Sequence, residues 1–243
     1  MKILINGSKG RMGQAVAVAA KLAGLEISAE CDIGETFTET DVAACDCAVD
    51  FSFHEVSPEL AEACARAGKP LVIGTTGHTA AERARIEAAA EKIPIVWAGN
   101  YSVGVNVLNW LVGKAARLLD PSFEIEIVEM HHRHKKDAPS GTAEKLLAIV
   151  ESARGCDKSV EKHGRAGIVG ERCREEIGVH ALRGGSVVGD HAVIFAGEGE
   201  RVELIHRAES RAIFANGAIR AAQWVCGGKA PGIYGMEAVL GLE

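Results

Sequence analysis

Short apolar segments alternate with longer alanine-rich, amphipathic segments over residues 2–97, and this alternation constrains the fold more than any other feature of the chain. The apolar segments are KILIN, LEISAEC, CAVDFS, KPLVIG and IPIVWA, and the helical segments between them span residues 11–23, 55–67 and 79–92. Strands that are almost wholly apolar belong to a sheet covered by helices on both faces. We therefore predict an α/β fold with a doubly wound parallel sheet.

The pattern changes after about residue 103. A helical segment over roughly 104–119 leads into FEIEIVEMH, whose apolar residues recur at every second position, as in a strand with one face in water. Another helix is predicted near 141–152, and it is followed by three strand-like segments, EEIGVHALR, SVVGDHAVIFAG and RVELIHRAE. The tail is again helical from Ser210 to Cys226. These elements predict an inserted α+β domain on a mixed sheet over 104–211, and a first domain made of 1–103 and 212–243.

Composition limits the partners and the compartment of the chain. The formal net charge of −6 provides no global attraction to nucleic acid or to an anionic membrane. The longest uncharged stretch, Trp97 to Gly113, is interrupted by glycines and asparagines and does not qualify as a membrane span. Seven scattered cysteines without a CxxC pair suit a reducing compartment, and the start MKILING lacks a signal-peptide pattern. We therefore expect a cytoplasmic protein with no nucleic-acid or membrane partner.

The first candidate site is a glycine-rich turn between the first strand and the first helix. Its sequence, Gly7-Ser8-Lys9-Gly10-Arg11-Met12-Gly13, has the spacing GxxGxxG rather than GxGxxG. It nevertheless follows a strand and opens a helix, which is the context in which such a turn binds a dinucleotide pyrophosphate. Asp32, 19 residues past Gly13, would accept hydrogen bonds from the adenosine ribose. The alternatives are a turn without a ligand and a solvated acid, and the pattern favours a Rossmann-type cofactor site.

The choice between NADH and NADPH stays open in the sequence. Asp32 favours NADH because an acid repels the 2′-phosphate of NADPH, whereas Lys9 and Arg11 offset that repulsion and permit NADPH. A second glycine turn, Gly74-Thr75-Thr76-Gly77, follows another predicted strand and falls on the same edge of the sheet. Ligands of open α/β sheets bind at that edge, although a plain strand-to-helix turn is the alternative interpretation.

The second candidate site is a basic, histidine-rich loop before a predicted helix. Residues 129–143 read EMHHRHKKDAPSGTA and contain three histidines and three fixed positive charges in a chain of net charge −6. The loop ends in Ser140-Gly141-Thr142 at a helix start, where amide and hydroxyl donors suit a carboxylate, and histidine is a source of protons near neutral pH. A zinc site is a weaker alternative, because the HHxH spacing is cramped for metal ligands and the neighbouring residues are cationic. A solvated basic turn without a ligand is a second alternative.

These segments resemble the dihydrodipicolinate reductase family, also called the 4-hydroxy-tetrahydrodipicolinate reductase family. EIVEMHHRHKKDAPSGTA, from Glu126, matches the signature of that family, and the segments GxxGRMG, GTTG, NYSVGVN and SRAIFANGA occur in family order over the whole chain. The resemblance implies the reduction of 4-hydroxy-tetrahydrodipicolinate to tetrahydrodipicolinate, with loss of water, by NADH or NADPH in the diaminopimelate route of lysine biosynthesis. It also implies a small dicarboxylate heterocycle as substrate and a homotetramer built through the second domain.

The resemblance further implies roles for individual residues. His131 would donate the proton, while Lys135 would assist protonation and, with His132, hold the substrate. The substrate carboxylate would bind to Ser140, Gly141 and Thr142. From the motifs and the resemblance together, the residues expected to contact the cofactor are Gly7, Lys9, Gly10, Arg11, Met12, Gly13, Asp32, Gly74, Thr75, Thr76, Asn100, Tyr101 and Ser102. No metal is implied.

Two other functions compete with the reductase. A nucleotide-sensing regulatory protein would use the same glycine turn without chemistry, but it has no need of a proton donor beside a carboxylate site. Other small two-domain dehydrogenases of amino acids, such as aspartate or homoserine dehydrogenases, share the glycine turn but should lack HHRHKKDAPSGT. The histidine-rich loop therefore favours the reductase over both.

Overall fold

The structure is a computed structural model and describes residues 1–242. The chain divides into two compact units, one made of Met1–Val103 with the chain from Arg211 onward and the other of Gly104–Ser210. This division differs from the expected domain boundaries only at Arg211, which belongs to the first unit. Glu243, the last residue of the first expected domain, lies outside the described residues. No helix within residues 1–242 is both long and apolar enough to cross a membrane.

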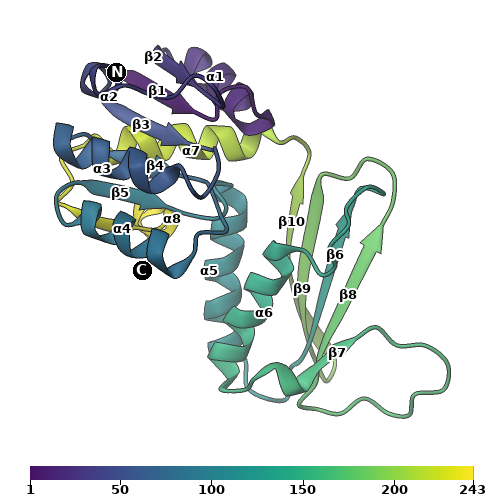
Figure 1. Cartoon of the computed structure of the whole chain (residues 1–243). Coiled ribbons are helices and arrows are strands. Elements are labelled where there is room, and N and C mark those ends of the chain that lie inside the picture. The colour runs from purple at the N-terminus through teal and green to yellow at the C-terminus, as the bar shows by residue number, and fades with distance from the viewer. Residues whose placement is uncertain (243) are drawn as a thin grey trace. The chain divides into compact units, whose positions relative to one another are not determined.

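The first unit is built on a six-stranded parallel sheet with the strand order β11-β5-β4-β3-β1-β2 (Figure 1). Its strands are β1 (Lys2–Asn6), β2 (Glu26–Cys31), β3 (Cys47–Asp50), β4 (Leu71–Ile73), β5 (Pro94–Trp97) and β11 (Gly232–Tyr234). Its helices are α1 (Arg11–Leu22), α2 (Glu39–Ala44), α3 (Ser57–Ala67), α4 (Ala80–Ala90), α7 (Ala212–Val225) and α8 (Met236–Leu240). The predicted doubly wound parallel sheet is confirmed.

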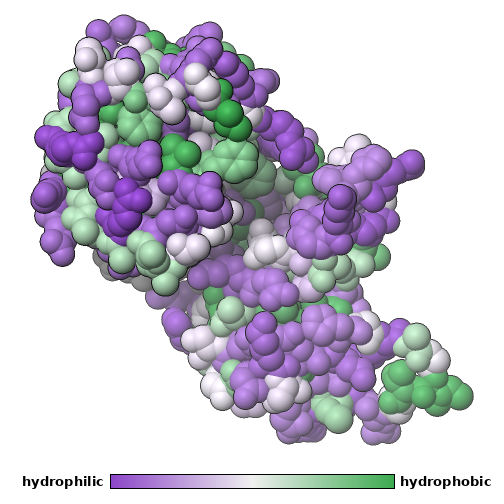
Figure 2. Space-filling view, viewed as in Figure 1, coloured by the Kyte–Doolittle hydropathy of each residue, from purple (hydrophilic) through white to green (hydrophobic). Residues whose placement is uncertain are grey.

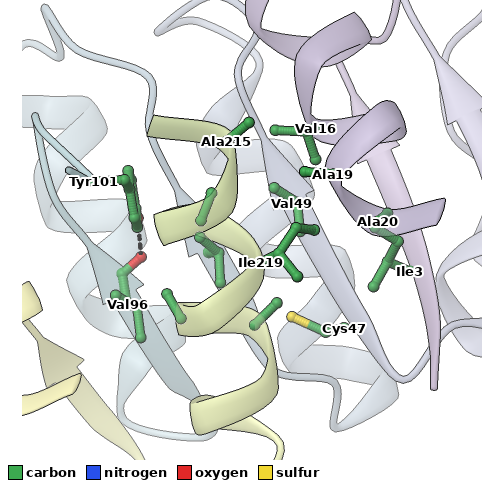
Figure 3. Packing of buried hydrophobic residues seen from close by; sticks show 14 of the residues in the cluster. Ile3, Val16, Ala19, Ala20, Cys47, Val49, Val96, Tyr101, Ala215 and Ile219 are labelled. Atoms are coloured by element: carbon green, nitrogen blue, oxygen red, sulfur yellow. Dashed lines mark hydrogen bonds between the residues drawn. The ribbon is translucent and has the colours of Figure 1, made fainter. Parts of the chain in front are cut away.

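Helices cover both faces of this sheet, as the apolar strands require. Ile3 and Ile5 of β1 pack with α1 and α7 on one face, and Leu4 between them packs with α3 and α4 on the other. Figure 3 shows the first of these faces, where Ala19 and Ala20 of α1 lie beside the strands. The predicted helical tail, α7, therefore completes the core of the first unit rather than extending from it.

The second unit is built on a five-stranded mixed sheet with the strand order β10-β9-β6-β8-β7. Its elements are α5 (Val103–Leu118), β6 (Glu124–His131), α6 (Gly141–Arg154), the 3-10 helix η1 (Lys158–Val160), β7 (Glu161–His163), β8 (Ile177–Arg183), β9 (Gly189–Gly197) and β10 (Glu200–Ala208). The central strand β6 runs parallel to β8 and antiparallel to β9. Apolar residues of α5 and α6 bury the odd-numbered side of β6, including Ile125 and Ile127. The predicted mixed sheet is confirmed.

Five elements of the structure were not predicted, and all are short. They are α2, η1, β7, β11 and α8. The helix α2 has one fully buried residue, Val42, and depends instead on a capping box in which Thr38 and Asp41 exchange hydrogen bonds. The helical segments among them are too short to display a helical period, and β7 and β11 lack the apolar runs that mark the predicted strands.

Ion pairs and hydrogen bonds connect the loop between β7 and β8 to the second sheet. The carboxylate of Glu126, on β6, accepts hydrogen bonds from Arg165 at 2.8 Å, Arg172 at 3.0 Å and His180 at 2.7 Å. Burial alone would raise the pKa of Glu126, but these donors outweigh it and lower the pKa to about 2. Figure 2 shows a hydrophobic patch at the tip of this loop, where Ile168 and Val169 are exposed.

Glu126 predicts a specific loss of stability in acid. Because the pKa of Glu126 falls from 4.5 to about 2 on folding, its contribution is complete above pH 4.5 and is lost as the pH falls through about 2. Across this window the wild type should lose on the order of 2 kcal/mol more free energy of unfolding than Glu126→Gln. Urea unfolding at a series of pH values measures this difference. Parallel losses in the two proteins would contradict the prediction.

Candidate active site

The predicted glycine turn forms a tight cradle between β1 and α1. Gly7 has a left-handed φ of 83°, and a side chain there would clash with the backbone carbonyl of Phe51. A side chain on Gly13 would clash with the carbonyl of Gly7, and one on Gly10 would lie 3.2 Å from the same oxygen. The close approach of the turn and the helix therefore requires glycine at positions 7 and 13, whereas a side chain at position 10 would make only a tight contact.

A cavity of about 230 Å³ opens beside this cradle, within the first unit. It lies where the chain reverses its direction across the sheet, between β1 and β3, which is where open α/β sheets bind ligands. No side chain caps the N-terminus of α1, which begins with the exposed Arg11 and the half-buried Met12. A Gly-lined cradle at an uncapped helix N-terminus fits the pyrophosphate of a dinucleotide. The residues that line the cavity are Asn6, Gly7, Gly10, Asp32, Ile33, Thr36, Phe37, Phe51, Ser52, Phe53 and Val56.

Asp32 lies at the rim of the same cavity, directly after β2. The backbone N–H groups of Ile33 and Lys9 donate to its carboxylate at 2.8 and 2.7 Å. These two donors lower the pKa of Asp32, so the carboxylate is ionised at neutral pH. The structure therefore brings an anionic hydrogen-bond acceptor next to the glycine cradle, at the position expected for a ribose.

Asp50 is a buried acid at this edge of the sheet that no motif in the sequence marks. It is fully buried at the end of β3 and accepts hydrogen bonds from the side chains of Asn6 at 2.8 Å, Ser52 and Ser57 at 2.5 Å, and Thr75 at 2.9 Å. These donors come from the ends of β1, β3 and β4 and from α3. Asp50 thus ties together the chain segments that carry the cradle and the second glycine turn.

The second predicted group of cofactor residues is divided between surface and interior. Gly74 is required because a side chain there would clash with the ring of Phe51, and Thr76 is exposed. The side chain of Thr75, however, is buried against Asp50. The hydroxyl of Tyr101 is buried within hydrogen-bonding distance of the Ile73 and Val96 carbonyls, as the dashed line in Figure 3 shows for Val96. The side chains of Thr75 and Tyr101 are therefore part of the core, which the sequence alone does not reveal.

Asn100 and Ser102 form a short turn on either side of Tyr101. The N–H of Ser102 donates to Oδ1 of Asn100 at 2.9 Å, and Ser102 is almost completely buried. This turn connects β5 with α5, and a side-chain oxygen that accepts from a backbone two residues later stabilises such a connection. The predicted residues at positions 100–102 therefore lie after β5, on the same edge of the sheet as the second glycine turn.

In the second unit, the predicted proton donor His131 is held by a buried carboxylate. Glu129 and His131 lie two residues apart on β6 and face the same side. Nδ1 of His131 lies 2.6 Å from Oε2 of Glu129, and Arg183 on β8 donates two hydrogen bonds of 2.8 Å to the same carboxylate. Burial alone would raise the pKa of Glu129, but Arg183 and His131 outweigh it and lower the pKa. An ionised acceptor assigns the hydrogen to Nδ1, so Nε2 is the atom left for a ligand.

The space beside Nε2 of His131 is kept open by Gly189, at the start of β9. A Cβ added to Gly189 would lie 2.9 Å from Nε2, closer than real Cβ contacts. We expect Gly189→Ala to displace the imidazole and lower kcat by about 10- to 100-fold. Steady-state kinetics measure the effect. Gly197→Ala is the matched control because its Cβ would lie 2.9 Å from the ring of Phe123, at the other end of the same strand. Equal losses in the two variants would contradict the prediction.

Ser140 connects the start of α6 to the same cluster. Its Oγ accepts a hydrogen bond from the N–H of Ala143, and its own N–H donates to Glu129 at 3.2 Å. The same Oγ lies 2.9 Å from Nε2 of His191, on β9. Burial, with the neighbouring His131, lowers the pKa of His191 to about 4, so His191 is neutral at neutral pH. His191 also packs edge-on against His131 at 5.2 Å between ring centroids.

The remaining predicted substrate residues follow along the loop. The ammonium of Lys135 lies 2.8 Å from the carboxylate of Asp137, and the backbone N–H of Lys135 donates to the carbonyl of His132 at 3.1 Å. Arg183 donates to the carbonyl of Asp137 at 2.7 Å and so joins this loop to Glu129. Gly141 is the first residue of α6, and no atom lies within 4 Å of the position that a Cβ would occupy there. Thr142, the next residue, is half-buried. Among residues 1–242, no group of three or more His, Cys, Asp or Glu side chains could hold a metal ion.

Three residues of this cluster were missed in the sequence: Glu129, Arg183 and His191. A signal existed for Glu129, because a strand period of two places it on the same face as His131. Arg183 and His191 reach the cluster through strand pairing, since His131 is opposite Arg183 on β8 and Glu129 is opposite His191 on β9. The register between strands that lie far apart in the sequence leaves no local pattern, so these two residues could not be predicted.

Comparisons with known proteins agree on one family. Residues 1–101 match the family model described as dihydrodipicolinate reductase, N-terminus, and residues 104–240 match the model described as dihydrodipicolinate reductase, C-terminus. The 4-hydroxy-tetrahydrodipicolinate reductase of Akkermansia muciniphila is 54% identical, with 100% of this chain and 99% of the relative covered. That of Thiobacillus denitrificans is 47% identical over the same shares.

Solved structures agree with this assignment at the level of the fold. A dipicolinate-bound dihydrodipicolinate reductase from Paenisporosarcina sp. TG-14 superposes with a TM-score of 0.80 at 24% identity, over 97% of both chains. An engineered D-amino acid dehydrogenase bound to NADP⁺ superposes with a TM-score of 0.56 at 13% identity, over 100% of this chain and 96% of that one. Both family models and the close relatives extend over nearly all of the sequence, and the chain therefore belongs to the dihydrodipicolinate reductase family.

Proposed function

We propose that the chain reduces 4-hydroxy-tetrahydrodipicolinate to tetrahydrodipicolinate, with loss of water, in the diaminopimelate route of lysine biosynthesis. Membership of the family supports the reaction and a nicotinamide cofactor. The observation that carries the proposal is the pairing of His131 with the buried Glu129, next to an N-capped helix start at Ser140. A proton donor beside a carboxylate-binding helix end is what reduction of a dicarboxylate needs.

The cofactor would be held by the cradle at Gly7, Gly10 and Gly13, with Asp32 on the ribose. When bound, the nicotinamide supplies a hydride to ring C4 of the dehydrated heterocycle. His131 would deliver a proton from Nε2 to the neighbouring ring carbon and would keep the hydrogen on Nδ1 that it shares with Glu129. Hydride and proton together saturate one double bond of the ring.

The substrate carboxylates would be bound by the histidine-rich loop and the start of α6. The backbone N–H groups of Gly141 and Thr142 lie in the first turn of a 14-residue helix, where the helix dipole favours an anion. Ser140 is held in place by His191 and Glu129, while His132 and Lys135 add positive or hydrogen-bonding groups from the loop. The dipicolinate named for the Paenisporosarcina reductase is itself a planar dicarboxylate, which supports this class of ligand.

Lys135 offers a direct test of the substrate site. We expect Lys135→Ala to raise KM for the substrate and to lower kcat, about tenfold or more in kcat/KM, because a charge-assisted contact to a carboxylate is lost. Lys136→Ala is the matched control, since Lys136 is the exposed neighbour in the same loop. Steady-state kinetics with both variants measure the difference. Wild-type kinetics in Lys135→Ala would remove this residue from the site.

We also propose a cytoplasmic homotetramer assembled through the second sheet. The face of this sheet away from α5 and α6 carries exposed apolar side chains, including Leu182 of β8 and Ile205 of β10. Exposed apolar groups on one sheet face are suited to burial against another copy. Light scattering after gel filtration should give four times the monomer mass of 25.6 kDa. A monomer at micromolar concentration would contradict the assembly.

The deciding experiment for the reaction is a coupled assay. The synthase that makes 4-hydroxy-tetrahydrodipicolinate supplies the unstable substrate in place, and loss of nicotinamide absorbance is followed in parallel with NADH and NADPH. Oxidation that depends on the synthase product is the expected result. Tight nucleotide binding without oxidation of either cofactor would favour a nucleotide sensor or a dehydrogenase with another substrate.

A further inference from the structure

Lys9, in the glycine turn, forms an ion pair with Glu35, in the loop after β2. Nζ of Lys9 lies 2.9 Å from Oε2 of Glu35. The hydrogen bond to Glu35 is the largest cause that raises the pKa of Lys9. Lys9 is one of the two cations that would offset repulsion between Asp32 and a 2′-phosphate, so its partner bears on the choice of cofactor.

The backbone fixes the position of Glu35. Asp32 and Glu35 exchange two backbone hydrogen bonds of 3.1 and 2.9 Å across a turn in which Gly34 has a φ of 83°. The carboxylate of Asp32 in turn accepts from the N–H of Lys9. Lys9, Asp32 and Glu35 therefore form one connected unit at the rim of the cavity, and Thr36, next to Glu35, lines that cavity.

The charges of this unit do not cancel. Two carboxylates and one ammonium leave one net negative charge at the place where an adenosine ribose would bind. A 2′-phosphate brought there meets this net charge and an ammonium that is already engaged by Glu35. Without Glu35 the unit would be neutral, and the ammonium of Lys9 would be free to pair with the phosphate.

Resting on the proposed nicotinamide function, we propose that Glu35 is a specificity-determining residue that favours NADH over NADPH by engaging Lys9. Asp32 alone leaves the preference open, because Lys9 and Asp32 carry opposite charges. Glu35 does not line the cavity, but its carboxylate pairs with Lys9 and makes the net charge of the three residues negative. The Lys9–Glu35 pair is largely exposed, so solvent screens it and the effect on selectivity is moderate rather than absolute.

The test compares two nucleotides that differ only in the 2′-phosphate. Calorimetry on the full chain gives Kd for 5′-AMP and for 2′,5′-ADP at fixed ionic strength, and the ratio of the two values isolates recognition of the phosphate. Glu35→Gln should tighten 2′,5′-ADP relative to 5′-AMP by about fivefold. The NADPH to NADH ratio of kcat/KM should rise in the same direction.

Two further variants separate the mechanism from a general charge effect. Glu26→Gln removes another exposed glutamate that pairs with a lysine, Lys2, at 3.5 Å and similar exposure, and should leave the Kd ratio unchanged. In a Lys9→Gln background, Glu35→Gln should change the ratio by no more than about twofold, because the ammonium to be released is gone.

Each outcome decides between the two proposals. An unchanged ratio in Glu35→Gln, or a fivefold gain that persists without Lys9, overturns the role of Glu35 while the cofactor site stands. Failure of the wild type to bind either nucleotide overturns the cofactor site and this inference together. A fivefold gain that depends on Lys9 supports both.

Discussion

His131→Gln is expected to lower kcat by about 10²- to 10⁴-fold, the usual contribution of a general acid. Glutamine has a similar length and polarity but carries no proton that it can release near neutral pH. Its amide also cannot reproduce the short contact between Nδ1 and Glu129. Binding of NADH should be unchanged, because the glycine cradle and Asp32 belong to the first unit whereas His131 belongs to the second.

The measurement combines kcat in the coupled assay with Kd for NADH from nucleotide fluorescence. His134→Gln is the matched control, since His134 is an exposed histidine three residues after His131, in the loop that follows β6. It should keep kcat within about threefold of the wild type, as substitutions at exposed positions usually have small effects. Equal losses of kcat and of NADH affinity in His131→Gln would indicate a structural role for His131 and would contradict its assignment as the proton donor.

The fold was readable in the sequence wherever a hydrophobic period extended over several residues. The five apolar runs of residues 2–97 became β1 to β5 because strands covered on both faces need no polar side. The alternation in FEIEIVEMH likewise became β6, with Ile125 and Ile127 turned towards α5 and α6. Where an element has only one buried residue, as α2 has Val42, there is no period to detect.

Only some residues of the candidate site could be predicted from the sequence, and there is a physical reason why the others could not. His131 and Ser140 lie in one continuous segment, so their types and spacing are visible in the sequence. Arg183 comes from another strand and meets Glu129 through sheet register, which depends on the whole second unit. Asp50 was hidden for a different reason: one acid at the end of an apolar strand resembles a solvated strand end until its four donors are in place.

Glu129→Gln should have the second-largest effect, although Glu129 is proposed as a positioning residue that acts through His131. Its carboxylate accepts hydrogen bonds from Arg183, from Nδ1 of His131 and from the N–H of Ser140. An amide has one oxygen and one NH₂ group, so at least one of these donors would face another donor. We expect kcat to fall by about 100-fold and the free energy of unfolding by about 3 kcal/mol.

A loss of stability alone would not separate positioning from packing, so the test needs a readout at the imidazole. In the wild type, ¹⁵N spectra should report hydrogen on Nδ1 of His131, whereas Glu129→Gln should give a mixture of tautomers. Glu129→Asp, which keeps the charge, should restore the tautomer and part of kcat. Glu126→Gln is the matched control, because Glu126 lies on the same strand with two arginines and a histidine. Since its side chain faces the other side of the sheet, it should cost stability and leave the His131 tautomer unchanged. A wild-type tautomer in Glu129→Gln would mean that the carboxylate supports the fold without orienting the proton donor.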